Sequence, residues 1–528
     1  MPSPAQETSY DRIPYESLPF PHTHPDRLAT AARLFGMDPA SPDKARVLEI
    51  GCASGGNLIP MALAAPEGRF VGVDLSARQV ARGRELIGRL GLGNIELNRA
   101  DLRDLDAGWG RFDYVIAHGL YSWIPAEARE RLLGAYATLL APSGVGFISY
   151  NVFPGWHLRT QIRDMVMYHA RHFPIEEQLG QAKAFLNFLA DNTPAEGDPY
   201  GAFLRQMRDF WATQDDSYLF HEFLEEVNAP LYFHEFAAQL PVHGLQYLAE
   251  SAVVMNLTMR FPPGVRDTLN RLGRDLVRRE QYMDFLVNRP FRESLVVGEG
   301  VRLDRRLSWE RVADFYLCAQ ALPVDGDVDW RLEQAVEFRS PNGGGLRVRH
   351  PLTKKVLTLL TERWPLGGRL DELLAVAAGA LRAQGVDPHP PGVGAEPAAA
   401  VAADLLLALA LGVVEFRILP PPCVAAAGER PKVSPYAVLE AEWRGRVTSL
   451  RHEIVNVTPL VRSLLPLLDG THDRSALVRA WMKAAQAGRL PLPPEAGKAK
   501  GAEAVAGVLG TKLDAILADL AKVGLLLA

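Results

Sequence analysis

Three glycines and an acidic residue lie close together at 49–57, where the sequence reads EIGCASGGN. The apolar run RVLEI precedes this segment and a helical pattern follows it, so a strand turns into a helix here. Glycine lets the backbone approach a ligand closely, and the free amides at a helix start face that ligand. The segment predicts a ligand-binding loop, and a purely structural tight turn is the weaker alternative.

A second acidic residue, Asp74, stands at the end of the next apolar run, RFVGVDL. It follows the loop by about twenty positions, from where a carboxylate reaches the ribose of a nucleoside cofactor. A dinucleotide loop would read G-x-G-x-x-G and would hold a pyrophosphate, which the carboxylate of Glu49 would repel. The same carboxylate suits a cofactor with a cationic amino group and no phosphate, such as S-adenosylmethionine. The pattern therefore favours a methyltransferase over a dehydrogenase.

Short apolar runs continue at the rhythm of an α/β protein. We expect strands at 46–52, 69–75, 94–102, 112–118 and 144–151, with helical stretches between them. Strands that alternate with helices in this way form βαβ units and a mainly parallel sheet.

The ordered segments VLEIGCASG, GVDLS, RADLRDL and FDYVIAHGLYSWIP resemble the successive motifs of class I S-adenosylmethionine-dependent methyltransferases. The resemblance implies a doubly wound, Rossmann-like, seven-stranded α/β sheet. It places Gly51, Ala53 and Gly55 along the methionine part of the cofactor and Asp74 at the ribose. The candidate cofactor-binding residues are Tyr10, Glu49, Gly51, Cys52, Ala53, Gly55, Asp74, Leu75, Asp101, Leu102 and His118.

The individual roles follow the same resemblance. Leu75 would pack on the adenine, Asp101 and Leu102 would border its edge, and His118 would close the pocket. Tyr10 and Tyr15 are candidates for a lid over it. Ala53 stands where the family usually has glycine, and alanine fits there if its φ is negative.

Flanking segments narrow the resemblance. The stretches at 9–29, 150–159, 221–251 and 281–296 are similar to methyltransferases with a regulatory-type middle domain, including rickettsial-type protein lysine methyltransferases. This resemblance implies N-methylation of lysine side chains in a protein substrate, such as an envelope or surface protein before export. A homodimer is left open. Methylation of a small molecule at oxygen or nitrogen, and a non-catalytic cofactor-binding module, stay as alternatives.

A lysine acceptor must lose its proton from a starting pKa of about 10.4, and an apolar, aromatic channel favours the neutral amine. Aromatic residues follow the fourth and fifth expected strands, at the sheet edge where ligands bind. Tyr121, Trp123, Tyr150 and Trp156 are therefore the candidate catalytic residues. The alternative is that they only anchor loops on apolar surface.

The remaining chain divides into further units. We expect a methyltransferase core at 1–160 and a mostly helical middle domain at 161–300, which leaves room for strands that complete the core sheet. The stretches at 347–377 and 449–481 look alike, since each places an Arg-His pair before two helices. They predict two winged-helix-like units, at 301–418 and 432–528.

Composition excludes several classes of protein. A net charge of −5 provides no overall attraction to a phosphate backbone, so nucleic acid is not an expected partner. The three cysteines are far apart, and neither His221-Glu222 nor His234-Glu235 forms H-E-x-x-H, so no metal site is expected. No apolar run reaches the ~20 residues of a membrane span, and a cytoplasmic protein without membrane insertion is expected.

Overall fold

A computed structural model describes residues 9–194, 197–391, 396–499 and 501–527. A seven-stranded sheet lies at its centre, in the order β3-β2-β1-β4-β5-β7-β6. The strands are β1 (Arg46–Ile50), β2 (Arg69–Asp74), β3 (Ile95–Arg99), β4 (Phe112–Ala117), β5 (Leu140–Asn151), β6 (Leu245–Glu250) and β7 (Phe291–Gly298). The predicted doubly wound, seven-stranded sheet is confirmed.

Strands β1 to β5 pair in parallel, whereas β7 is antiparallel to both β5 and β6. The last two strands lie in the region where the sequence showed only a helical pattern. The strand signal of β7 is weak in the sequence because this strand includes Arg292 and Glu293, and charged residues are unusual inside a sheet.

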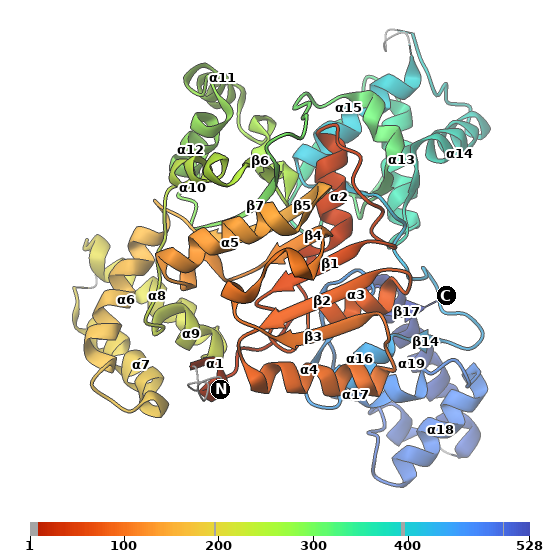
Figure 1. Cartoon of the computed structure of the whole chain (residues 1–528). Coiled ribbons are helices and arrows are strands. Elements are labelled where there is room, and N and C mark those ends of the chain that lie inside the picture. Colours follow the sequence, from red (N-terminus) through yellow and green to blue (C-terminus); the bar gives the residue numbers. More distant parts are fainter. Residues whose placement is uncertain (1–8, 195–196, 392–395, 500, 528) are drawn as a thin grey trace.

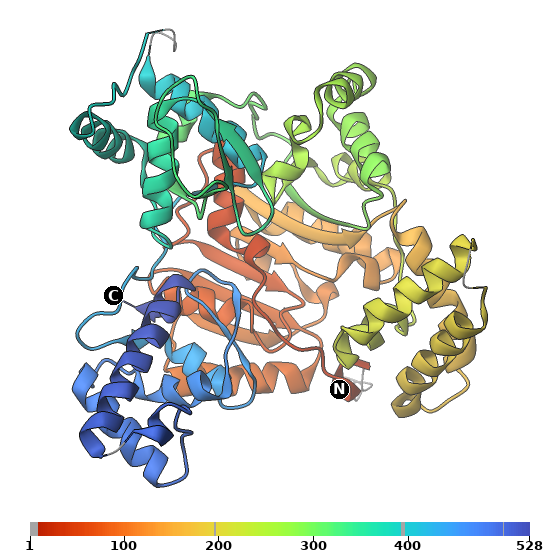
Figure 2. The same ribbon diagram turned by 180° about the vertical axis from the view of Figure 1, so that it is seen from behind.

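Alternating residues of the strands build two apolar cores, one on each face of the sheet. Phe70, Tyr114 and Phe147 belong to one core, whereas Val71, Val115 and Ile148 belong to the other. Helices cover both faces, as Figures 1 and 2 show. They are α2 (Pro25–Leu34), α3 (Leu58–Ala64), α4 (Ala77–Leu90) and α5 (Ala126–Leu139) from the first part of the chain, and α10 (Phe233–Gln239) from the middle part.

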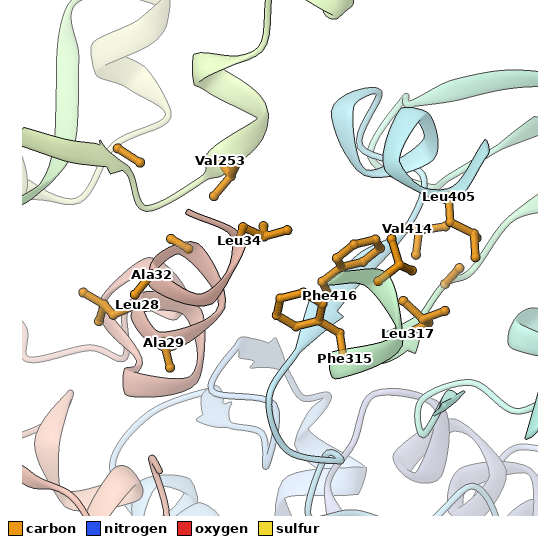
Figure 3. Packing of buried hydrophobic residues seen from close by; sticks show 14 of the residues in the cluster. Leu28, Ala29, Ala32, Leu34, Val253, Phe315, Leu317, Leu405, Val414 and Phe416 are labelled. Carbon is orange, nitrogen blue, oxygen red and sulfur yellow. The ribbon is translucent and has the colours of Figure 1, made fainter. Parts of the chain in front are cut away.

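Helix α2 is buried between the sheet and the first C-terminal unit. His24 accepts a hydrogen bond from the amide of Asp26 and so begins the helix. Figure 3 shows Leu34 of α2 beside the paired rings of Phe315 and Phe416, whose centroids are 5.3 Å apart. The buried carboxylate of Asp26 accepts hydrogen bonds from two amides of the same unit, at Ile418 and Leu419. This unit is therefore part of the core, not an appendage.

The middle part of the chain forms two groups of helices. One group has its own apolar core and lies beside the short N-terminal helix α1 (Ser9–Arg12), as both views show. Its helices are α6 (Trp156–Ala170), α7 (Ile175–Asn192), α8 (Pro199–Ala212) and α9 (Asp216–Phe223). The other group, α10 with α11 (Pro263–Leu272) and α12 (Leu276–Val287), packs near β6 and β7.

A buried ionic network joins this second group to the sheet. The guanidinium of Arg292 in β7 is fully buried and contacts the carboxylates of Glu250, Glu280 and Asp284 at 2.7, 3.2 and 2.8 Å. Arg289 adds a second cation, 3.0 Å from Asp284. Removal of one partner from such a cluster leaves an uncompensated buried charge, so the network fixes α12 against β6 and β7.

The C-terminal part contains two units with the same order of elements: an opening strand, a hairpin, three helices and a closing strand. In the first unit these are β8 (Tyr316–Cys318), β10 (Val336–Arg339) with β11 (Gly345–Val348), α13 (Pro351–Glu362), α14 (Leu370–Ala383), α15 (Pro397–Ala410) and β13 (Glu415–Arg417). In the second they are β14 (Lys432–Val433), β15 (Arg446–Thr448) with β16 (Ile454–Asn456), α17 (Pro459–Leu464), α18 (Arg474–Gln486), α19 (Ala502–Lys522) and β17 (Leu526–Leu527).

The closing strand pairs antiparallel with the opening strand in both units. The first unit inserts β9 (Leu322–Pro323) and β12 (Gly368–Arg369), and the second inserts α16 (Pro435–Ala441). The second unit packs near α4 (Figure 1). Within the described segments, no helix is long and apolar enough to cross a membrane.

Candidate functional site

The loop after β1 turns sharply at the carboxyl end of the sheet. The amides of Gly51 and Cys52 both donate to the carbonyl of Val73 in β2, at 2.8 and 3.1 Å. Gly51 and Gly55 have positive φ angles of 80° and 76°, which glycine adopts at low cost. The thiol of Cys52 is buried against Gly72, so the contribution of Cys52 to the loop surface comes from its backbone.

Ala53 departs from the expectation for its backbone. Its φ is +48°, so the negative φ that would suit alanine is not adopted. The reason is the hydrogen bond from its amide to Oδ2 of Asp74, 2.8 Å long, for which the loop must bend in the left-handed region. An L-residue with a Cβ is strained in that region by roughly 1–2 kcal/mol.

Glu49 is buried at the end of β1, and its two carboxylate oxygens differ. Oε1 accepts a hydrogen bond from Nδ2 of Asn57 at 2.7 Å, whereas Oε2 is buried without a hydrogen-bond partner. Burial raises the pKa of Glu49 to about 7. A buried carboxylate oxygen without a hydrogen-bond partner favours a cationic ligand. The amino group of S-adenosylmethionine carries such a positive charge.

Asp74 lies at the end of β2 and holds the loop in place. Its Oδ1 accepts from the amide of Ser76 at 2.8 Å, and Oδ2 accepts from Ala53. Each carboxylate oxygen can accept a further hydrogen bond, so two vicinal hydroxyls also fit. The side chain of Leu75, next in sequence, is half-exposed and offers an apolar surface to an aromatic base.

Asp101 follows β3, and its carboxylate is already engaged. It accepts from the backbone amide and the guanidinium of Arg103, the latter at 2.6 and 2.9 Å. The hydrogen bonds from Arg103 hold the pKa of Asp101 below its usual value. Leu102 packs against the apolar core beside α5. The predicted adenine contact of these two residues stays a prediction.

The N-terminal segment lies against the loop, and the lid role of Tyr10 and Tyr15 stays a prediction. Tyr10 stacks on His221 of α9 with ring centroids 4.4 Å apart, and Tyr15 meets the same imidazole edge-on. Asp11 accepts a hydrogen bond from the hydroxyl of Ser76, beside Asp74. Further along, the hydroxyl of Ser17 accepts from the amide of Gly56 at 2.7 Å. The segment thus contacts both the middle helices and the loop.

His118 directly follows β4 and lies beside two aromatic rings. The centroid of its ring is 3.9 Å from the ring centroid of Phe20 and 6.2 Å from that of Phe291. The hydroxyl of Ser149 in β5 accepts from the amide of Gly119 at 2.7 Å and is within hydrogen-bond distance of Nδ1 of His118, at 3.1 Å. Burial lowers the pKa of His118 to about 4, which keeps the imidazole neutral at pH 7.

The four candidate catalytic residues lie in two environments. Successive residues of a strand face opposite sides, so Tyr150 points away from Ser149 and His118. Tyr150 and Tyr121 are buried in the core that contains Val71, Val115 and Ile148. The hydroxyl of Tyr150 forms a hydrogen bond with Ser294, and that of Tyr121 with Gln239. These contacts weigh against the predicted contact with an acceptor and match the packing alternative.

Trp123 and Trp156 meet edge-to-face at 6.2 Å. Trp156 is fully buried, whereas Trp123 is partly exposed on its loop. Their contact with an acceptor stays a prediction, and of the two only Trp123 presents surface to solvent.

Several residues at this edge were missed in the sequence. They are Phe20, His22, Asn57, Phe291, Glu293 and His452. Asn57 and Phe20 lie in segments that the motifs already marked, so their position was a usable signal. Phe291 and Glu293 belong to β7, and His452 is 395 residues from its partner Asn57. No local pattern links those residues to the loop.

The histidines that raised the question of a metal have other partners. His221 contacts the carboxylate of Glu225 and the carbonyl of Ile13, both at 2.6 Å, and His234 contacts Gln281. Across the described ranges, no three His, Cys, Asp or Glu side chains gather as a metal site.

We predict that Ala53→Gly relieves the strained turn. The free energy of unfolding is expected to rise by about 1 kcal/mol, because the strain removed slightly exceeds the added freedom of the unfolded chain. Urea unfolding measures it. Gly55→Ala is the matched control, since it adds a Cβ at φ +76° within 3.2 Å of Ile59, and it is expected to destabilise. A destabilising Ala53→Gly would contradict the strained turn.

Three family models match the chain in order along its length. Residues 47–144 match a methyltransferase domain, residues 215–297 match a predicted methyltransferase regulatory domain, and residues 429–525 match the C-terminal winged helix domain of PKMT. The first match covers the loop and Asp74, and the last covers the unit that contains His452.

Similar proteins cover nearly the whole chain. The uncharacterized protein RP789 of Rickettsia prowazekii is 31% identical over 95% of this chain and 90% of its own length. The solved structure of PKMT2 from Rickettsia typhi, also solved in complex with AdoHcy, is 27% identical and has a TM-score of 0.84 over 98% of this chain and 100% of that one. These matches agree with the site geometry, in which the buried carboxylate of Glu49 and the aspartate at the end of β2 flank a glycine loop. The chain therefore belongs to the class I S-adenosylmethionine-dependent methyltransferases, in the family of the rickettsial PKMT proteins.

Proposed function

We propose that this methyltransferase acts on the side-chain amine of lysine in a protein substrate. The observation that supports this most directly is the carboxylate of Glu293 at the edge of the sheet, beside the ring of His22 and two residues from the exposed ring of Phe291. A cationic amine is the acceptor class that such a carboxylate and aromatic rings attract. The likeness to PKMT2 along the whole chain also supports a protein acceptor.

The residues of the loop fit the cofactor. Oε2 of Glu49 would accept from its amino group, the backbone at Gly51 and Gly55 would follow its methionine part, and Asp74 would hold its ribose hydroxyls. Leu75 would pack on its adenine. When bound, S-adenosylmethionine supplies an electrophilic methyl group on a sulfonium, so the protein's task is to align an uncharged nucleophile with it.

Glu293 is placed to take the proton from that nucleophile. It lies directly opposite Ser149 in the β5–β7 pair, and opposite residues in an antiparallel pair face the same side of the sheet. Ser149 positions His118, so Glu293 emerges on the His118 side. Burial raises the pKa of Glu293 to about 7, which suits a group that accepts a proton near neutral pH.

The surroundings of Glu293 favour the neutral amine. Nδ1 of His22 is 3.7 Å from Oε2 of Glu293, and burial lowers the pKa of His22, which keeps that imidazole uncharged. The rings of Phe20 and Phe291 flank His118 and add apolar surface to the same region. Partial burial favours the neutral amine by desolvation, and Glu293 would supply the base that takes its proton.

Incubation with radiolabelled S-adenosylmethionine and envelope or whole-lysate protein, followed by acid hydrolysis and amino-acid analysis, tests the proposal. We expect label in methylated lysine. Label confined to the low-mass fraction would support a small-molecule acceptor instead, and label in another amino acid would overturn the lysine assignment.

Asp74→Ala is expected to weaken cofactor binding. The loss of two hydrogen bonds to ribose, together with the bond that shapes the loop at Ala53, should raise the Kd at least tenfold, or about 1.4 kcal/mol. Titration calorimetry with S-adenosylmethionine measures it. Glu85→Ala, an exposed carboxylate on α4, is the matched control and should leave the Kd unchanged. An unaltered Kd in Asp74→Ala would remove Asp74 from the site.

Glu293→Gln is expected to lower kcat about 100-fold at pH 7, because general-base catalysis contributes on that scale. The folded wild-type group loses its proton as the pH rises through about 7, so the wild-type rate should rise over that range. The variant lacks this rise and should gain rate only as lysine itself deprotonates. Glu299→Gln, an exposed neighbour, is the control. A wild-type pH profile in Glu293→Gln would exclude Glu293 as the base.

A further inference from the structure

A histidine of the second C-terminal unit reaches into the cofactor site. His452 lies in the turn between β15 and β16, has a positive φ of 64° and is buried. Its Nε2 is 2.8 Å from Oδ1 of Asn57, the residue that precedes α3 in the cofactor loop. The loop that binds cofactor therefore has a hydrogen-bond partner in a unit near the other end of the chain.

The hydrogen bonds of Asn57 fix the direction of its amide. Oδ1 accepts from the backbone amide of Phe20 at 2.9 Å and from His452. Nδ2 donates to Oε1 of Glu49 at 2.7 Å and to the hydroxyl of Thr23 at 2.9 Å. The hydroxyl of Thr23 donates in turn to the carbonyl of Phe20. Every donor and acceptor of the amide is used, and the nitrogen faces Glu49.

His452 serves as a donor in this arrangement. Oδ1 of an amide can only accept, so Nε2 must bear the hydrogen. Burial, and to a lesser extent His24 and Arg417, hold the pKa of His452 well below its usual value. The ring of His24 is 5.1 Å away. The neutral Nε2–H form therefore persists through neutral pH.

Ion pairs hold the unit where this contact can form. Nη1 of Arg444 is 3.0 Å from the carboxylate of Glu16, and Arg446 bonds to the same carboxylate. Arg446 also lies 2.9 Å from Asp215, next to α9. In the cofactor domain, Arg89 of α4 forms an ion pair with Glu442 of this unit, at 2.6 Å. The unit thus contacts the N-terminal segment, the middle helices and the cofactor domain.

We propose that His452 is a positioning residue of the cofactor site, which holds Asn57 so that its amide nitrogen faces Glu49 and thereby sets the affinity for S-adenosylmethionine. The role is independent of the methyl acceptor, so it stands whether or not lysine is the substrate.

The proposal has a pH signature. The groups that influence Glu49 are Asn57, whose donated hydrogen bond lowers its pKa, and Asp74, whose negative charge raises it; burial raises it most. Cys52 and Tyr136 are close enough for Glu49 to affect their own titration. If the amide of Asn57 turns, its oxygen faces Glu49 and the pKa of the carboxyl rises. Less of the anion is then present at pH 7, and a cationic amino group binds more weakly.

His452→Phe keeps a ring of similar size and removes the donor, whereas His452→Gln retains an N–H donor. Titration calorimetry of the full-length protein with S-adenosylmethionine between pH 6 and 9 compares them. We expect His452→Phe to raise the Kd about fivefold at pH 7, the scale of one net hydrogen bond. The loss should diminish toward pH 9, and His452→Gln should recover most of it. His472→Phe, on the same unit, is the control.

Equal weakening of binding at every pH, without recovery in His452→Gln, would show a merely structural role and overturn the proposal, as would an unchanged Kd. If His452→Phe does not fold, nitrogen-15 NMR of the wild-type protein decides instead. The proposal requires that His452 remain neutral with hydrogen on Nε2 from pH 6 to 9. A protonated ring, or hydrogen on Nδ1, would refute it.

Discussion

The buried carboxylate of Glu49 imposes the constraint around which the site is built. A carboxylate away from water is costly unless its oxygens are hydrogen-bonded or neutralised, and here one oxygen has a partner while the other does not. Asn57 satisfies the first oxygen, and in the proposed function a cationic ligand satisfies the second. On that proposal, the burial that makes Glu49 costly in the free protein also makes the site selective, because a ligand without a positive charge would leave the cost in place.

This constraint explains why distant segments converge on one short loop. Asn57 can support Glu49 only if Oδ1 of Asn57 has hydrogen-bond donors of its own. The two donors are the amide of Phe20 in the N-terminal segment and His452 in the second C-terminal unit. The N-terminal segment is itself held from three sides, by Ser76, by His221 and by Arg444. Units that are separate along the chain therefore contact one another around the cofactor domain.

The sequence predicted what is local and missed what is distant. The loop, Asp74 and the first five strands follow from short apolar runs and turn residues, and the ordered motifs specify the cofactor. Strand β7 was missed because its Arg292 belongs to a buried ionic network, which the spacing of apolar residues does not reveal. Tyr150 was selected for its place near the end of the fifth strand, but the side that a strand residue faces depends on register, which sequence does not display. His452 and Glu293 reach the site only through tertiary packing.

The separation of Asn57 and His452 also has a consequence for biosynthesis. The 395 residues between them take a ribosome about 20–80 s to add, at ~5–20 residues per second. During that interval the first five strands are already available to fold, yet the amide of Asn57 lacks its second donor. On the proposal made for His452, the pocket therefore gains its full affinity for S-adenosylmethionine only after the second C-terminal unit has been translated and has folded.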